Sequence, residues 1–153
     1  MFIRGQRLGP IRPGVVAADD DPAMRALISH ALTDAGYQPY MAMDVREAMD
    51  QLRRPGVAAA IVDMLFVNSG GRSGLDVLRF IREDRGLQHL PIIVLTGFPL
   101  NHDVVAEIES HHAELWHKPI DVAHLTMRLD EVLQAQIAHL TATTDPSGCR
   151  TAS

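Results

Sequence analysis

Val57-Ala-Ala-Ala-Ile-Val-Asp63 is the stretch that decides the fold of this chain. A short apolar run that stops at a carboxylate is typical of a buried strand in a parallel sheet, with the carboxylate at the end of the sheet. Similar runs lie at residues 15–18 before Asp19, residues 91–95 before Thr96, and residues 113–117 before Lys118. We therefore predict four buried strands, each followed by a polar residue, and a fifth, less strongly indicated strand at residues 37–42.

Helical patterns separate these runs. The signals are Asp21-Pro22 with a closing Gly36, Asp44-Val-Arg-Glu47 with a closing Pro55-Gly56, Ser73-Gly-Leu-Asp76, the run from Asn101 to Ser110, and Asp121 before an apolar stripe that ends at Leu140. Five strands that alternate with five helices predict an α/β fold, a doubly wound five-stranded parallel sheet with helices on both faces.

Length and composition favour a single domain. The chain has 153 residues, 46% of them hydrophobic, which is enough for one core. Residues 1–13 contain glycines and prolines without periodicity and are expected to form an irregular arm. We place the domain at residues 14–140 and expect the polar tail, residues 141–153, to be disordered.

Several classes of protein are disfavoured. The formal charge of −5, from 14 basic and 19 acidic residues, argues against a nucleic-acid-binding surface. No apolar run approaches ~18 residues, so neither a membrane span nor a signal peptide is expected. The single cysteine, Cys149, allows no internal disulfide, which is compatible with a reducing compartment, and we expect a cytoplasmic protein.

The polar residues at the strand ends should meet, because the sites of such folds lie beyond the carboxyl ends of the strands. Three carboxylates in one place repel one another unless a cation lies between them, and oxygen ligands suit Mg²⁺. An ammonium, a hydroxyl and an amide nearby would stabilise the charge that develops in phosphoryl transfer. The residues concerned are Asp19, Asp20, Asp63, Thr96, Gly97 and Lys118, with Asp63 as the nucleophile that becomes an aspartyl phosphate.

This set of residues resembles the receiver domain of bacterial two-component response regulators. The resemblance extends over residues 14 to 140 and is carried by Asp19-Asp20 with Arg25, Asp63, Thr96-Gly97 and Lys118-Pro119. It implies a flavodoxin-like sheet with strand order 2-1-3-4-5, an order taken over from the family and not obtained from the pattern of residues.

The resemblance also implies a Mg²⁺ site. Asp20 would bind the metal directly and Asp19 would bind it through water. Asp63 would be both ligand and phosphoacceptor, and the backbone carbonyl of Leu65 would complete the site.

The phosphoryl oxygens would contact Thr96, the Gly97 amide and Lys118. The implied donor is a histidine on a kinase or phosphotransfer protein. We expect a stand-alone regulator that signals through protein contacts and has no enzymatic activity beyond self-phosphorylation and autodephosphorylation. The final helix is long enough to add a homodimer to these partners.

Two features depart from the family. A glycine usually begins the next helix eight positions after the acceptor; Gly71 has that offset, but the helical pattern begins at Gly74, which indicates a three-residue insertion. Leu115 replaces the usual tyrosine or phenylalanine, and strand alternation should turn Trp116 to the opposite face. Both departures favour an alternative interpretation, in which the chain is a degenerate receiver that binds a partner without phosphorylation.

Other interpretations are weaker. A register that pairs Asp20 with Asp21 would misplace Arg25, which lies five residues after the second acid in the family. A flavin phosphate would be repelled by the three aspartates after the first strand. A hydrolase with an aspartate nucleophile usually has a second aspartate two residues on, where this chain has Leu65. The eight histidines fit no zinc spacing.

Overall fold

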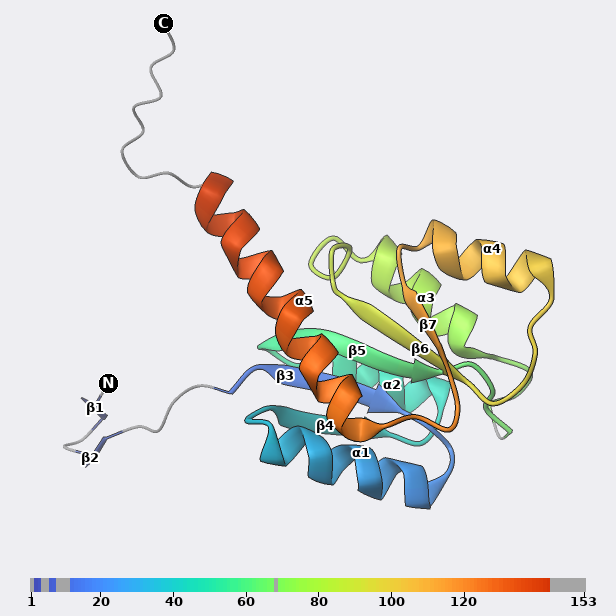
Figure 1. Cartoon of the computed structure of the whole chain (residues 1–153), viewed down its shortest axis with the longest axis horizontal. Helices are drawn as coiled ribbons and strands as arrows, with labels where there is room; N and C mark the ends of the chain where they lie inside the picture. The colour runs from blue at the N-terminus through green and yellow to red at the C-terminus, as the bar shows by residue number, and fades with distance from the viewer. Residues whose placement is uncertain (1, 4–5, 8–11, 68, 144–153) are drawn as a thin grey trace, which may run out of the picture.

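A five-stranded parallel sheet forms the centre of the molecule in the computed structural model, which describes residues 2–3, 6–7, 12–67 and 69–143 (Figure 1). Its strands are β3 (Gly14–Ala18), β4 (Gln38–Ala42), β5 (Val57–Asp63), β6 (Ile92–Thr96) and β7 (Glu114–His117). The order across the sheet is β4-β3-β5-β6-β7. Numbered along the chain, this is 2-1-3-4-5, so the predicted flavodoxin-like topology is confirmed.

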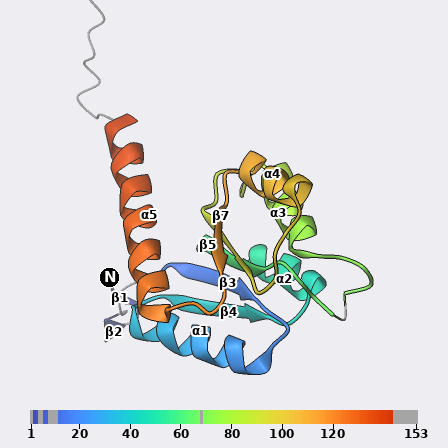
Figure 2. The ribbon, with the colours of Figure 1, turned by 45° about the vertical axis from the view of Figure 1, so that its right-hand side comes forward.

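Helices cover both faces of the sheet. They are α1 (Pro22–Asp34), α2 (Val45–Leu52), α3 (Gly74–Glu83), α4 (His102–Ser110) and α5 (Val122–Thr143). The apolar faces of α1 and α5 pack on one side of the sheet, and those of α2, α3 and α4 pack on the other (Figures 1 and 2). Alternation within the strands supplies both layers: in β3, Val15 and Ala17 face α1 and α5, whereas Val16 and Ala18 face the other helices.

The helices begin where their capping residues predict. The Asp21 and Asp44 side chains accept hydrogen bonds from the Ala23 and Glu47 amides. Ser73 and Asp76 form a reciprocal capping box at the start of α3. These bonds satisfy amides that have no partner within a helix, so short polar residues in the sequence set the helix starts.

The two ends of the chain differ from expectation. Helix α5 continues to Thr143, so the predicted tail is wrong for residues 141–143, because neither glycine nor proline interrupts the helix there. Residues 144–153 lie outside the described part. Within the arm predicted to be irregular, β1 (Phe2–Ile3) pairs antiparallel with β2 (Gln6–Arg7), a pairing that suits two short segments separated by a dipeptide ending in glycine.

The last turns of α5 project beyond the sheet (Figures 1 and 2). Ile137 in this part of the helix is exposed.

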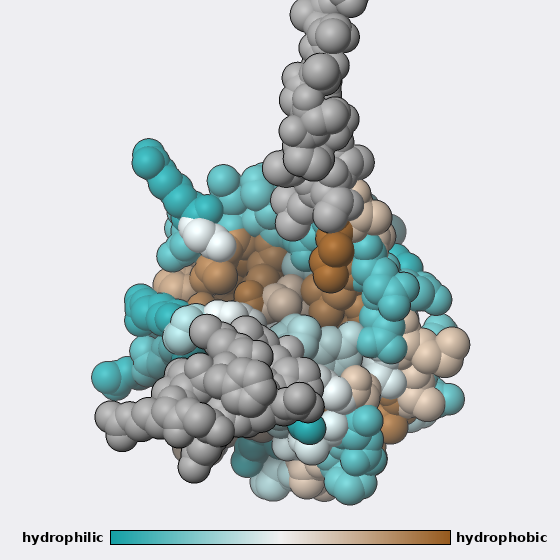
Figure 3. All heavy atoms as spheres, turned by 90° about the vertical axis from the view of Figure 1, so that its left-hand side faces the viewer, coloured by the Kyte–Doolittle hydropathy of each residue, from teal (hydrophilic) through white to brown (hydrophobic). Residues whose placement is uncertain are grey.

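Figure 3 looks at the end of the molecule where the strands of the sheet begin, and shows apolar side chains gathered near its centre. Among the described residues, no helix combines the length and the apolar character that crossing a bilayer requires.

Candidate metal and phosphoacceptor site

The carboxyl ends of four strands bring the predicted site residues together. Asp19 and Asp20 follow β3, and Asp63 and Thr96 end β5 and β6. Carboxylate oxygens of Asp19, Asp20 and Asp63 lie within 4.8 Å of one another. Because β3 and β5 are hydrogen-bonded neighbours, the three acids meet although more than forty residues of chain separate Asp63 from the other two.

Lys118, which follows β7, lies inside this acidic cluster. Its Nζ donates a hydrogen bond to Asp19 Oδ2 at 2.9 Å and lies 3.5 Å from Asp63 Oδ2. Burial lowers the pKa of Lys118, but the hydrogen bond to Asp19 and the charge of Asp63 outweigh burial and raise the pKa above its ordinary value. The lysine therefore stays charged and offsets part of the repulsion between the carboxylates.

Asp63 is nearly inaccessible to solvent and resists ionisation. Burial and then the charge of Asp19 raise the pKa of Asp63 to about 6, although Lys118 and the Leu65 amide oppose this shift. A cation among the three acids would favour their ionised forms. The donor set consists of carboxylate oxygens, and Asp20 is open to water, so the residues fit Mg²⁺.

The Thr96 hydroxyl makes its hydrogen bonds with the backbone of Phe98. It donates to the Phe98 carbonyl at 2.8 Å and accepts from the Phe98 amide at 3.2 Å. Gly97 faces Lys118: a Cβ placed there would lie 3.8 Å from Lys118 Cδ. The contacts of Thr96 and Gly97 with phosphoryl oxygens thus stay predictions, and for Thr96 they require the hydroxyl to leave Phe98.

Two backbone amides and the Arg25 side chain hold the two acids after β3. The Asp19 side chain accepts a hydrogen bond from the Asp21 amide at 2.9 Å. The backbone carbonyl of Asp19 accepts one from Arg25 Nη1 at 2.8 Å. This contact links the Arg25 side chain to Asp19. Asp20 Oδ2 accepts from the Val67 amide at 3.0 Å. Nothing in the side chain of Val67 signals this contact, so the sequence alone does not predict it.

The structure locates two further residues that bear on the resemblance, Leu65 in the loop after β5 and Leu115 in β7. Leu65 is half exposed, and its amide donates to Asp63; a role for its carbonyl stays a prediction. Leu115 packs with the cluster beneath α2, α3 and α4, whereas Trp116 packs on the opposite face, where its ring lies 4.9 Å from that of His124. The predicted opposite orientation of Trp116 is therefore confirmed.

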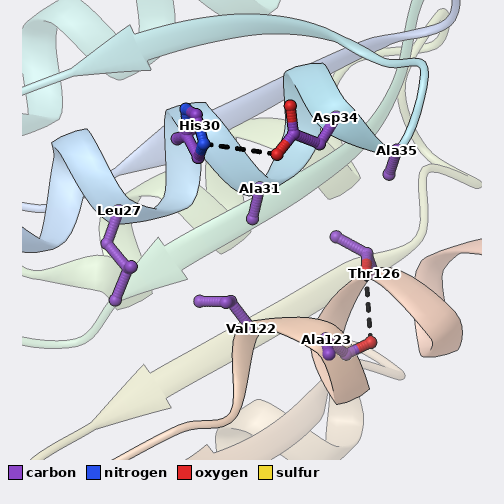
Figure 4. Close-up of a pocket in the computed structure, with 8 residues that line it drawn as sticks. All are labelled: Leu27, His30, Ala31, Asp34, Ala35, Val122, Ala123 and Thr126. Carbon is purple, nitrogen blue, oxygen red and sulfur yellow. Dashed lines mark hydrogen bonds and ion pairs between the residues drawn. The ribbon is translucent and has the colours of Figure 1, made fainter.

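A separate pocket of about 340 Å³ lies between α1 and α5 (Figure 4). Its walls include Leu27, Ala31 and Val122, and the cluster of carboxylates contributes nothing to them. At its rim, His30 Nε2 lies 3.3 Å from Asp34 Oδ2, but both side chains are largely exposed, so this contact contributes little. The acids and the lysine at the strand ends are the better functional site.

Known proteins with similar sequences include two regulators. The chain is 26% identical to chemotaxis protein CheY-3 of Vibrio cholerae over 121 residues, which cover 78% of this chain and 91% of that protein. It is 22% identical to the phosphate regulon transcriptional regulatory protein PhoB of Escherichia coli, with 78% of this chain and 51% of PhoB covered.

Solved structures show the same fold. Chemotaxis protein CheY4 of Vibrio cholerae matches with a TM-score of 0.69 and 27% identity, over 80% of this chain and 99% of that chain. A CheY-like receiver domain protein of Methanospirillum hungatei matches with a TM-score of 0.75 and 18% identity, over 84% and 99%. The family pattern of the response regulator receiver domain matches residues 15–130. This chain therefore belongs to the response regulator receiver domain family.

Proposed function

We propose that this protein is a single-domain response regulator that accepts a phosphoryl group on Asp63 in the presence of Mg²⁺. The donor is a histidine of a kinase or phosphotransfer protein. The observation that carries the proposal is the position of the Asp63 carboxylate, beside two further carboxylates and 3.5 Å from the Lys118 ammonium. A nucleophile, ligands for a cation and a fixed positive charge are what phosphoryl transfer requires.

In this reaction an Asp63 carboxylate oxygen attacks the phosphorus atom. The new bond is an aspartyl phosphate, and the bond from phosphorus to the histidine nitrogen breaks, so the imidazole leaves with the electron pair. Asp63 must be ionised to attack, and a pKa of about 6 leaves it mostly ionised at neutral pH. Mg²⁺ held by Asp19, Asp20 and Asp63 would neutralise charge on the phosphoryl oxygens.

Two further residues respond to the new group. Lys118 Nζ already lies between Asp19 and Asp63, and can turn to a phosphoryl oxygen without leaving the site. Thr96 has to exchange its hydrogen bond to the Phe98 carbonyl for one to the phosphoryl group. Phosphorylation would thereby rearrange the turn after β6 and alter the surface around β7 and its flanking helices, where we place the downstream protein partner.

The experiment that tests the proposal is the intact mass of the protein after incubation with a small phosphodonor. We expect one added phosphoryl group on wild type with Mg²⁺, none with excess chelator, and none on Asp63→Asn. Asp21→Asn is the matched control, because Asp21 is an exposed capping residue and should leave modification unchanged. A wild-type protein that stays unmodified and binds no Mg²⁺ would contradict the proposal.

The second candidate is a degenerate receiver that binds its partner without phosphorylation. It is favoured by Leu115 in place of an aromatic residue and by the Thr96 hydroxyl bonded to Phe98. An Asp63→Asn protein that responds fully to signal in cells would support this candidate.

A cytoplasmic location and a homodimer through α5 are further parts of the first proposal. A monomeric mass in solution, with and without phosphorylation, would contradict the homodimer.

A further inference from the structure

We infer that the backbone amide of Val67 is a positioning group for Mg²⁺: it holds the Asp20 carboxylate in the orientation that binds the metal. The loop after β5 thereby sets the metal affinity of the site. This inference rests on the proposed metal site and adds a residue that lies 47 positions from the ligand it orients.

The three acids of the site differ in how they are held. Asp19 is fixed by the Asp21 amide and by Lys118. Asp63 accepts a hydrogen bond from the Leu65 amide and lies near Lys118. Among the interactions of the described residues, the Val67 amide is the one hydrogen bond to the Asp20 carboxylate. Asp20 is also the more exposed of the three, so without this bond its side chain would rotate freely into water.

The segment that carries the amide is anchored on both sides. Before Val67, the side chains of Met64 and Phe66 are buried in the core. After it, Ser69 Oγ accepts from the Val45 amide at the start of α2, at 3.2 Å. The Gly74 amide closes the base of the loop by donating to the Met64 carbonyl at 3.0 Å. The position of the Val67 amide is therefore set by the core and by α2.

The contribution of Val67 comes from its backbone. Its side chain is 75% exposed and points away from the packed interior. A bond from the amide to Oδ2 leaves Oδ1 and the remaining lone pairs of the carboxylate for the cation. Groups that orient a metal ligand in this way typically change metal affinity by roughly 10–100-fold when they are removed.

The test compares Val67→Pro, which lacks the amide hydrogen, with Val67→Ala, which keeps it. Mg²⁺ binding is measured by calorimetric titration of the unphosphorylated full chain. We expect Val67→Pro to bind Mg²⁺ about tenfold or more weakly than wild type. Val67→Ala should bind as wild type does, because only the exposed side chain changes.

A second measurement examines the hydrogen bond without metal. The amide resonance of Val67 and its rate of hydrogen exchange are followed by NMR in wild type, Asp20→Ala and Asp21→Ala. We expect the Val67 resonance to shift and its exchange to accelerate in Asp20→Ala but not in Asp21→Ala. This measurement also decides the question if circular dichroism shows that Val67→Pro does not fold.

The outcomes separate this inference from the proposed function. If wild type binds no Mg²⁺, the proposed metal site itself fails. If wild type binds Mg²⁺ and a folded Val67→Pro binds it equally well, the positioning role is overturned while the phosphoacceptor proposal stands. A Val67 resonance that is insensitive to Asp20→Ala would overturn the positioning role in the same way.

Discussion

Asp63 ends a strand that is buried on both faces, and its environment favours the neutral carboxyl. Burial and the charge of Asp19 raise the pKa of Asp63 to about 6 from an ordinary value of 3.8. The folded protein therefore binds a proton in this pH interval that the unfolded chain has lost. The contribution of Asp63 to stability should fall as the pH rises from about 4 through about 6, and stay lower above that window.

The substitution Asp63→Asn isolates this effect, because asparagine resembles the neutral acid in shape and does not titrate. We expect Asp63→Asn and wild type to be similarly stable below about pH 4. Above about pH 6, Asp63→Asn should be more stable by roughly 1–2 kcal/mol, after allowance for solvent screening. The measurement is urea unfolding in metal-free buffer from pH 4 to 8. A stability difference that does not change with pH would contradict this account.

The start of α3 lies directly against the end of β5, next to Asp63. A Cβ at Gly74 would lie 2.5 Å from the Asp63 carbonyl oxygen and 3.0 Å from Met64 Cα. Both are backbone atoms, so they cannot turn aside as a flexible side chain would. Close approach of the helix start to the strand end therefore requires glycine at this position.

Gly74→Ala should destabilise the protein by about 1–3 kcal/mol, because the backbone next to Asp63 has to shift. Gly86→Ala is the control, since its Cβ would meet only the Asp84 side chain, at 3.3 Å. Thermal unfolding of both variants checks the prediction. Equal melting temperatures for the two would show that the contact at Gly74 is easily relieved.

The Arg82 side chain joins α3 to two further parts of the chain. Its guanidinium donates to the carbonyls of His111, Gln88 and Leu90, at the end of α4 and in the segment before β6. Burial lowers the pKa of Arg82, but three carbonyl partners compensate its charge.

Arg82→Leu leaves these carbonyls without their donor, and we expect a loss of about 2–3 kcal/mol in the free energy of unfolding. Arg85→Leu, at an exposed position three residues later, should change this free energy by less than about 0.5 kcal/mol. Urea unfolding of both variants provides the comparison. If Arg82→Leu lowers the free energy of unfolding no more than Arg85→Leu does, the hydrogen bonds of Arg82 make no net contribution to stability.

At the scale of the whole molecule, the three acids proposed to hold Mg²⁺ come together only in the folded chain, because Asp63 meets Asp19 and Asp20 through the pairing of β5 with β3. A cation that binds only the folded state stabilises it by mass action, by about 2.7 kcal/mol at a hundredfold excess over its dissociation constant. The melting temperature of wild type should therefore rise with Mg²⁺ and return to its metal-free value with chelator.

Asp20→Asn should lose most of this rise, whereas Asp21→Asn should keep it, because Asp21 caps α1 and lies outside the cluster. Thermal unfolding at several Mg²⁺ concentrations checks both expectations. A rise of the same size in all three proteins would mean that Mg²⁺ acts elsewhere on the chain.

The sequence by itself determined the alternation of strands and helices, the starts of the helices and the residues that gather at the strand ends. These features are local: side-chain periodicity distinguishes strands from helices, and a capping residue lies within three positions of the amide it binds. Parallel strands then carry the polar residues that follow them to one end of the sheet, so Asp19, Asp20, Asp63 and Lys118 could be grouped before the fold was known.

Only the tertiary structure decided how these groups are held. Lys118 bonds to Asp19 across 99 residues, Asp20 to the Val67 amide across 47, and the Thr96 hydroxyl turns to Phe98. Every residue except proline carries the same backbone amide, so no side-chain pattern marks the one amide that reaches a carboxylate. The path of the loop through space selects it, and that path depends on where Phe66 is buried and where α2 begins.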